Sequence, residues 1–179
     1  MILTTSLQSI NDLLGKLERE EYRAYHARKE IHKADHFYNF CVTAHAMKDY
    51  FLEYKGLAEH KHKGRYHEMW NNDVFLIAVS EIANTAKHFM LRERRSSKPK
   101  ELKTKGVEPK ESCFVNVCID DKGRLLEAFV IKPDLIVTFK DGKEFELWEF
   151  TKHVTDYWRT FLESEGVIVR RQSIKELLP

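Results

Sequence analysis

Apolar residues recur at helical spacing over residues 71–95, and this stretch has the clearest pattern in the chain. No Gly or Pro interrupts it between Trp70 and Arg92, and Asp73 or either of the two preceding asparagines can cap its start. The side opposite its core face is not the charged surface of an ordinary amphipathic helix. We therefore expect a central helix that packs on more than one side. Its core face consists of Phe75, Ala78, Val79, Ile82, Ala86 and Phe89.

A second seam of the same helix is apolar at both ends and polar in the middle, where it carries Glu81, Asn84 and His88. The predicted helix over residues 35–54 repeats this arrangement, with His45 and Asp49 in the middle of its own second seam. If the two helices pack antiparallel, the two polar sets face each other. The core face of the helix over residues 35–54 consists of Phe37, Phe40, Cys41, Ala44, Met47 and Phe51.

Buried polar groups need partners, so this polar set has two interpretations. The imidazoles of His45 and His88 and the carboxylates of Asp49 and Glu81 are suited to acid–base chemistry or to metal binding. Alternatively, they form a hydrogen-bond network that fixes the helix pair. Structural networks also hold perturbed charges, and we favour the structural interpretation.

The remaining pattern predicts helices at both ends and strands between them. Residues 6–33 are helical, either as part of one long bent helix or as a separate one, and residues 55–69 form a basic, His-rich connection. We expect one domain with a bundle over 1–92, a basic linker over 93–112, a β-meander over 113–147 and a closing helix over 148–166. The meander has turns at DDKG, KPD and KDGK. The predicted fold is mainly α (α+β): a helical bundle with a small antiparallel meander before the last helix.

Composition limits the function classes. The 179 residues are 42% hydrophobic with a net charge of +2, which is far from the basic balance of a dedicated nucleic-acid binder. Three cysteines without zinc-like spacing indicate reduced thiols in the cytoplasm. The first residues do not resemble a signal peptide, and no apolar run is long enough to span a membrane, so we expect no membrane partner.

Other candidate sites are weaker. His32 and His36 have the spacing of two metal ligands on one helix, but no third ligand is fixed, so surface histidines are the better interpretation. Arg19 and His26 form an Arg-x6-His pair suited to phosphate binding and proton transfer, on a helix that is better interpreted as a solvated charged face. The basic loop over 92–105 lacks the aromatics that stack on bases. We predict no cofactor and assign no metal.

Three stretches resemble a known group of proteins. EIANTAKHFML, from Glu81, resembles the "D-[IL]-A-N-x-[ST]-K-H" signature of a large group of bacterial proteins with helical bundles. HFYNFCVTAHAMKDYFLEY, from His36, resembles their "F…TAxHxxDW" helix, and LWEFTKHVTDYWRTFLESEGV, from Leu147, resembles their closing helix. The chain is similar to bundles of the HEPN kind. The matching positions are Thr43, Ala44, His45, Asp49, Glu81, Ala83, Asn84, Lys87 and His88.

The HEPN resemblance implies two functions, because that superfamily contains RNA-cutting toxins and defence effectors as well as binding modules without catalysis. Its active ribonucleases carry Arg-x4-6-His on a late helix, whereas Arg19 and His26 lie on the first. We therefore expect a binding module for a protein or RNA partner in the bacterial or phage cytoplasm, acting in defence or stress. Homodimerisation is compatible with such a bundle.

Two alternatives stay open. One is a metal-independent ribonuclease with His88, Lys87 and His45 as catalytic residues and with Asn84, Glu81 and Asp49 as binding residues. The weaker one is a metal-binding protein that uses histidines and carboxylates.

Overall fold

The computed structural model describes residues 7–59, 63–85, 102–170 and 172, and it combines helices with a small antiparallel sheet, as the sequence predicts. The helices are α1 (Ile10–His26), α2 (Glu30–Tyr54), α3 (Gly64–Asn72), α4 (Val74–Thr85) and α5 (Leu147–Ser164). The strands are β1 (Thr104–Ile119), β2 (Leu125–Phe139) and β3 (Glu144–Glu146).

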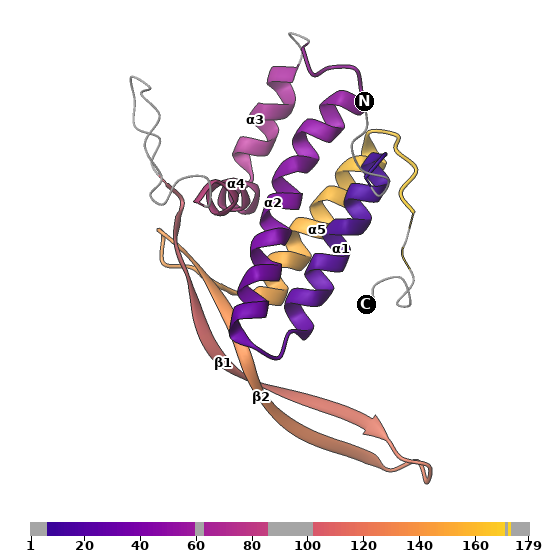
Figure 1. Cartoon of the computed structure of the whole chain (residues 1–179), viewed down its shortest axis with the longest axis vertical. Coiled ribbons are helices and arrows are strands. Elements are labelled where there is room, and N and C mark those ends of the chain that lie inside the picture. The colour runs from indigo at the N-terminus through magenta and orange to yellow at the C-terminus, as the bar shows by residue number, and fades with distance from the viewer. Residues whose placement is uncertain (1–6, 60–62, 86–101, 171, 173–179) are drawn as a thin grey trace.

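Helices α1, α2 and α5 lie side by side along the bundle, and α3 lies beside the C-terminal part of α2 (Figure 1). Aromatic rings fill the space between these helices: the Phe51 and Phe161 centroids are 4.7 Å apart, and those of Trp70 and Trp158 are 5.8 Å apart. Both tryptophans are completely buried. The predicted core face of the helix over residues 35–54 is confirmed, because all six of its residues are buried.

The first two helices are separate, and the break between them falls earlier than the predicted boundary between residues 33 and 35. Helix α1 ends at His26, Ala27 is extended, and α2 begins at Glu30. The carbonyl of Tyr25 in the last turn of α1 accepts hydrogen bonds from Lys33 Nζ at 3.2 Å and Lys132 Nζ at 3.1 Å. Cations at a helix C-terminus stabilise the end of the helix, and these two lysines fix the break.

The predicted central helix is divided differently from the expectation. Helix α3 covers residues 64–72, so it includes the end of the predicted connection over 55–69 and the first two residues of the predicted central helix, and α4 starts after Asp73. Asp73 Oδ1 accepts from the amides of Phe75 at 2.9 Å and Leu76 at 3.0 Å, which confirms it as an N-cap. Helix α4 is described to Thr85, so the predicted continuation over 86–95 lies outside the described residues. In Figure 1, α4 is seen nearly end-on and crosses α2, so the two are not the antiparallel pair of the sequence prediction.

The sheet has the strand order β1-β2-β3 with antiparallel pairing throughout. The turn predicted at KPD is wrong, because Pro133 pairs with Glu111 inside a continuous β2. Proline is tolerated there because β2 pairs with β3 only from Ile136 to Thr138, which leaves its other edge open beside the proline. The predicted linker is also shorter than expected, because β1 already begins at Thr104.

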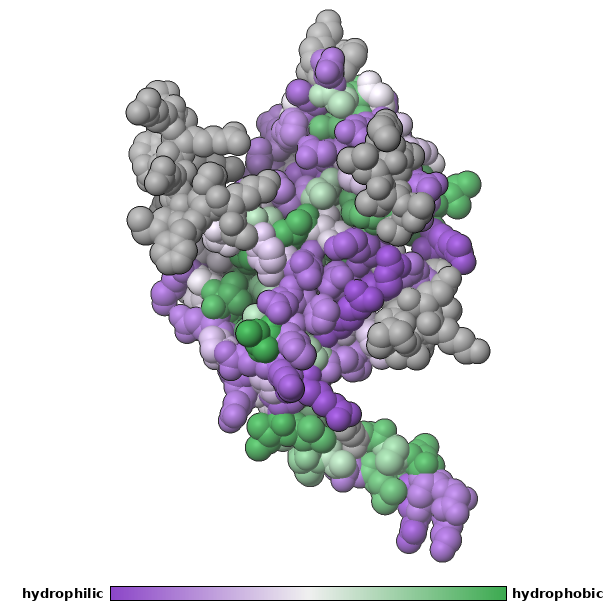
Figure 2. Space-filling model, in the orientation of Figure 1, coloured by the Kyte–Doolittle hydropathy of each residue, from purple (hydrophilic) through white to green (hydrophobic). Residues whose placement is uncertain are grey.

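Strand β2 has a buried half and an exposed half. Leu135, Val137 and Phe139 pack into the core of the bundle, whereas every residue from Leu125 to Ile131 is exposed. We call residues 113–131, with the turn at their centre, the arm. The arm extends away from the bundle (Figure 1), and Figure 2 shows hydrophobic residues along most of it while its end is hydrophilic.

Helix α5 agrees with the predicted closing helix over 148–166, and Gly166, just beyond its end, has φ +79°. Within the described residues, no helix combines the length and apolar character needed to cross a bilayer.

Candidate functional site

A polar cluster joins α2 to α4 around the hydroxyl of Ser80. His45 Nδ1 lies 3.1 Å from Ser80 Oγ, and Lys48 Nζ donates to the same oxygen at 2.9 Å. Ser80 Oγ in turn donates to the carbonyl of Leu76 at 2.8 Å. Because a hydroxyl has one proton, Ser80 accepts from both His45 and Lys48. This hydrogen-bond arrangement leaves no proton of Ser80 directed at His45, so it favours a helix-joining role over activation of the serine.

Glu81 turns away from this cluster towards the sheet. Its carboxylate accepts from the backbone amides of Lys103, at 2.9 and 3.1 Å, and Thr104, at 2.8 Å. Amides at the start of β1 need acceptors, and a carboxylate supplies strong ones. Glu81 therefore fixes the place where β1 begins.

The other predicted site residues are dispersed. Asn84 Nδ2 donates to the Ser80 carbonyl at 2.6 Å within its own helix, and the side chain of Asp49 is exposed. Lys87 and His88 lie outside the described residues. The structure thus brings His45 to α4, but it directs Glu81 to the sheet.

Sequence reasoning missed Lys48 and Ser80. Lys48 follows His45 by one helical turn, and Ser80 precedes Asn84 by one turn, so helical spacing already placed both beside the predicted seams. A search of the seams for every polar residue type, serine and lysine included, would have found them.

The weaker candidates have contacts of their own. His36 Nδ1 lies 3.0 Å from Glu20 Oε2, and the His26 ring centroid lies 4.2 Å from that of Tyr22. Burial lowers the pKa of His26, and the nearby positive charge of Lys132 lowers it further. In the described part of the chain, no three His, Cys, Asp or Glu side chains gather where they could hold a metal ion. His60, His62 and the loop over 92–101 lie outside the described residues.

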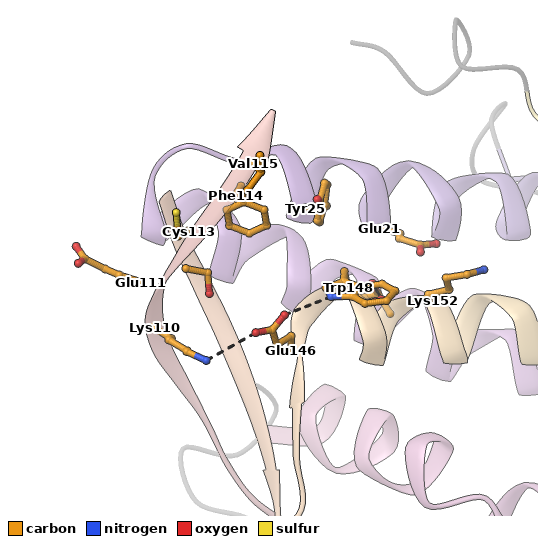
Figure 3. Close-up of a pocket in the computed structure, with 12 residues that line it drawn as sticks. Glu21, Tyr25, Lys110, Glu111, Cys113, Phe114, Val115, Glu146, Trp148 and Lys152 are labelled. Carbon is orange, nitrogen blue, oxygen red and sulfur yellow. Dashed lines mark hydrogen bonds and ion pairs between the residues drawn. The ribbon is translucent and has the colours of Figure 1, made fainter. Parts of the chain in front are cut away.

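A pocket of about 610 Å³ lies where the arm meets the bundle. Figure 3 shows Glu21 and Tyr25 of α1 facing Trp148 and Lys152 of α5, with Phe114 of β1 at one end. The carboxyl of Glu21 accepts from Thr155 Oγ1 at 2.7 Å, and burial raises the pKa of Glu21. The pocket thus combines aromatic walls with a carboxyl that holds its proton more strongly than usual.

The base of the arm is held by buried charge. Lys33 Nζ lies 3.7 Å from Asp134 Oδ1, and burial lowers the pKa of Lys33 although the carboxylate opposes this. Lys132 Nζ lies 3.8 Å from the ring centroid of Phe114 and 4.2 Å from that of Tyr25. These contacts fasten β1 and β2 to α1 and α2 at the base of the arm.

Beyond this base, the arm carries the largest group of exposed apolar side chains among the described residues. Elsewhere such residues are scattered singly over the bundle, as is normal for a protein surface. On the arm, eight large apolar residues are between 39% and 70% exposed. They are Val115, Val117, Ile119, Leu125, Leu126, Phe129, Val130 and Ile131.

Searches against family models, curated proteins and solved structures return no match to this chain. The residues themselves must therefore support any functional assignment. Of the features described, the arm has the largest group of exposed apolar side chains, whereas the hydroxyl of Ser80 is fully hydrogen-bonded.

Proposed function

We propose that the protein is an interaction module that binds a protein partner through the arm. The HEPN-like bundle of the sequence prediction would be its scaffold, in the cytoplasm. The observation that carries the proposal is the exposure of eight large apolar side chains on one projecting hairpin. Exposed apolar patches of this kind mark interaction sites, because water solvates them poorly.

The chemistry of the arm favours protein over RNA. Between residues 113 and 131, charges are confined to the turn and to Glu127, so the strands offer no row of cations for phosphates. Its one aromatic residue beyond the base is Phe129, whereas binding of single-stranded RNA combines cations with several stacking rings. Aliphatic and aromatic side chains on a β-ribbon suit a protein surface.

The ribonuclease alternative keeps His45, Lys87 and His88 as its catalytic candidates. The Ser80 contact of His45 supports a structural role for that histidine. The metal-binding alternative has no group of ligands to support it among the described residues. Both alternatives stay predictions.

Site-specific photo-crosslinking in the native host tests the proposal. A photoreactive phenylalanine analogue replaces Phe129, which is 70% exposed on the arm, and in the control it replaces Ile31, which is 67% exposed on α2. We expect discrete protein adducts from position 129 and none from position 31. Equal adducts from both positions, adducts to RNA, or no adduct from position 129 would contradict the proposal.

A further inference from the structure

The arm is apolar on both of its faces. Directly paired residues of an antiparallel ribbon share a face, and Val115 pairs with Phe129 while Ile119 pairs with Leu125. This face carries Val115, Val117, Ile119, Leu125, Phe129 and Ile131, and we call it the apolar face. Cys113, paired with Ile131, and Glu127, paired with Val117, lie on the same face. The opposite face carries Phe114, Cys118, Leu126, Ala128 and Val130.

The edges of the arm are open as well. Strand β1 pairs only with β2 in the described sheet, and β3 reaches no further along β2 than Ile136. The backbone groups on the outer edges of both arm strands therefore have no strand partner in the described part of the chain. Two-stranded ribbons are marginally stable in water by themselves, and open edges are templates for pairing with another chain.

The exposed apolar surface has the size of a stable interface. The eight large residues expose between 39% and 70% of their surface. The six on one face of the ribbon present roughly 650 Å², against about 600–1,000 Å² per partner in a standard interface and 300–600 Å² for the largest patch of an ordinary monomer.

We infer that the occupant of the arm is the arm of a second copy of this chain, an inference that rests on the proposed function. Two-fold symmetry places the same patch on both sides of an interface, so the patch must be self-complementary. The apolar face meets this condition because Glu127, which pairs with Val117, is the single charge on it, so two copies meet with little like-charge repulsion.

The charged end of the arm agrees with an antiparallel arrangement of the two arms. Asp120 accepts from the amides of Lys122 at 2.9 Å and Arg124 at 2.8 Å and pairs with Arg124 Nε at 2.8 Å. This compact turn stays in water when the apolar strands pack side by side. A dimer formed through the helices has less apolar surface to support it, because exposed apolar residues on the described helices are scattered.

Sedimentation of the full chain over a range of micromolar concentrations tests the inference. We expect the unmodified chain to be a dimer. The double variant Phe129→Thr/Ile131→Thr keeps β-propensity but removes apolar area, and it should associate at least about tenfold more weakly. The control Ile31→Gln/Met69→Gln changes exposed apolar residues outside the arm and should leave association unchanged.

A second measurement uses the chain without a disruptive substitution. Cys113 and Cys118 are exposed on the arm, whereas Cys41 is buried, so a short bifunctional thiol reagent reacts with the arm alone. We expect a covalent dimer that disappears in Cys113→Ser/Cys118→Ser. An unmodified chain that stays monomeric and gives no covalent dimer overturns the inference, as does a monomer that binds phosphatidylglycerol-containing vesicles through the arm.

The two proposals fail in different ways. A monomeric chain whose position 129 crosslinks to a different protein overturns self-association and leaves the interaction module standing. Loss of every protein adduct at position 129 overturns both.

Discussion

Lys33 and Asp134 form an ion pair between α2 and β2, with 3.7 Å between Nζ and Oδ1 and side chains that are 0% and 3% exposed. Asp134 lies at the boundary between the exposed and buried halves of β2. The pair therefore joins the bundle to the arm at the point where the arm leaves it.

Replacing Lys33 by Met should destabilise the protein by about 3–5 kcal/mol, because it leaves the buried charge of Asp134 without its cation. Urea unfolding measures the loss. The double variant Lys33→Met/Asp134→Asn removes both charges and should recover most of it, while the side-chain amide introduced at position 134 still offers an oxygen to the backbone N–H of Leu135. A single variant as stable as the unmodified chain would show that the pair contributes nothing.

Replacing Glu81 by Ala should loosen the start of β1. The carboxylate accepts from two backbone amides there, and charged hydrogen bonds of this kind contribute about 1.5–3 kcal/mol each before solvent exposure weakens them. Hydrogen exchange should show faster exchange at Lys103 and Thr104 and little change in α1. Asp49→Ala is the control, because that exposed carboxylate lies on another helix. Unchanged exchange at both amides would contradict the proposal that Glu81 fixes the start of β1.

Helical periodicity predicted the α elements well where a face was plainly apolar. Phe37, Met47 and Phe51 are buried as expected, and α5 ends at Ser164, two residues before the predicted end of the closing helix. The KPD turn was misread because a proline usually marks a turn, while an open strand edge also accommodates one. The position of the open edge is a tertiary fact that no local pattern contains.

The candidate site was less predictable for the same reason. Spacing placed Glu81 on a polar seam, but its partner amide at Lys103 is 22 residues away, and only the folded chain brings them together. The arm was predicted as part of a small meander, since alternating apolar residues normally indicate a strand that packs on its own core. Periodicity predicts that Val117 and Phe129 are buried against other apolar residues. It does not show whether those residues belong to the same chain or to a partner.

Replacing Ser80 by Ala should cost about 1–2 kcal/mol, because the bonds from His45 and Lys48 to its hydroxyl are lost. Thermal unfolding measures the effect. Ser164→Ala, which removes a hydroxyl bonded to the Phe161 carbonyl, is the control and should cost less.

Substitution of His45 tests the ribonuclease alternative. If His45 only joins two helices, His45→Ala lowers stability and leaves any RNA cleavage by the purified protein unchanged. Loss of cleavage in His45→Ala and His88→Ala at temperatures where both variants are folded would restore the catalytic interpretation.

Glu21 should make stability depend on pH in a defined direction. Burial raises its pKa above the ordinary 4.5, so the folded state binds more protons than the unfolded state between 4.5 and the folded value. The contribution of Glu21 to stability is therefore complete below 4.5 and is lost as pH rises through the folded pKa. Glu21→Gln stays neutral and keeps an oxygen for the hydroxyl of Thr155.

Urea unfolding of both proteins from about pH 4 to about pH 8 measures this effect. The variant should gain stability relative to the unmodified chain as pH rises, and the difference should level off once Glu21 is fully ionised in the folded state. Glu163→Gln, at an exposed position of α5, is the matched control and should show a smaller trend. A Glu21→Gln profile parallel to that of the unmodified chain would mean that Glu21 ionises as it does in water. The pocket at the base of the arm would then hold an ordinary carboxylate.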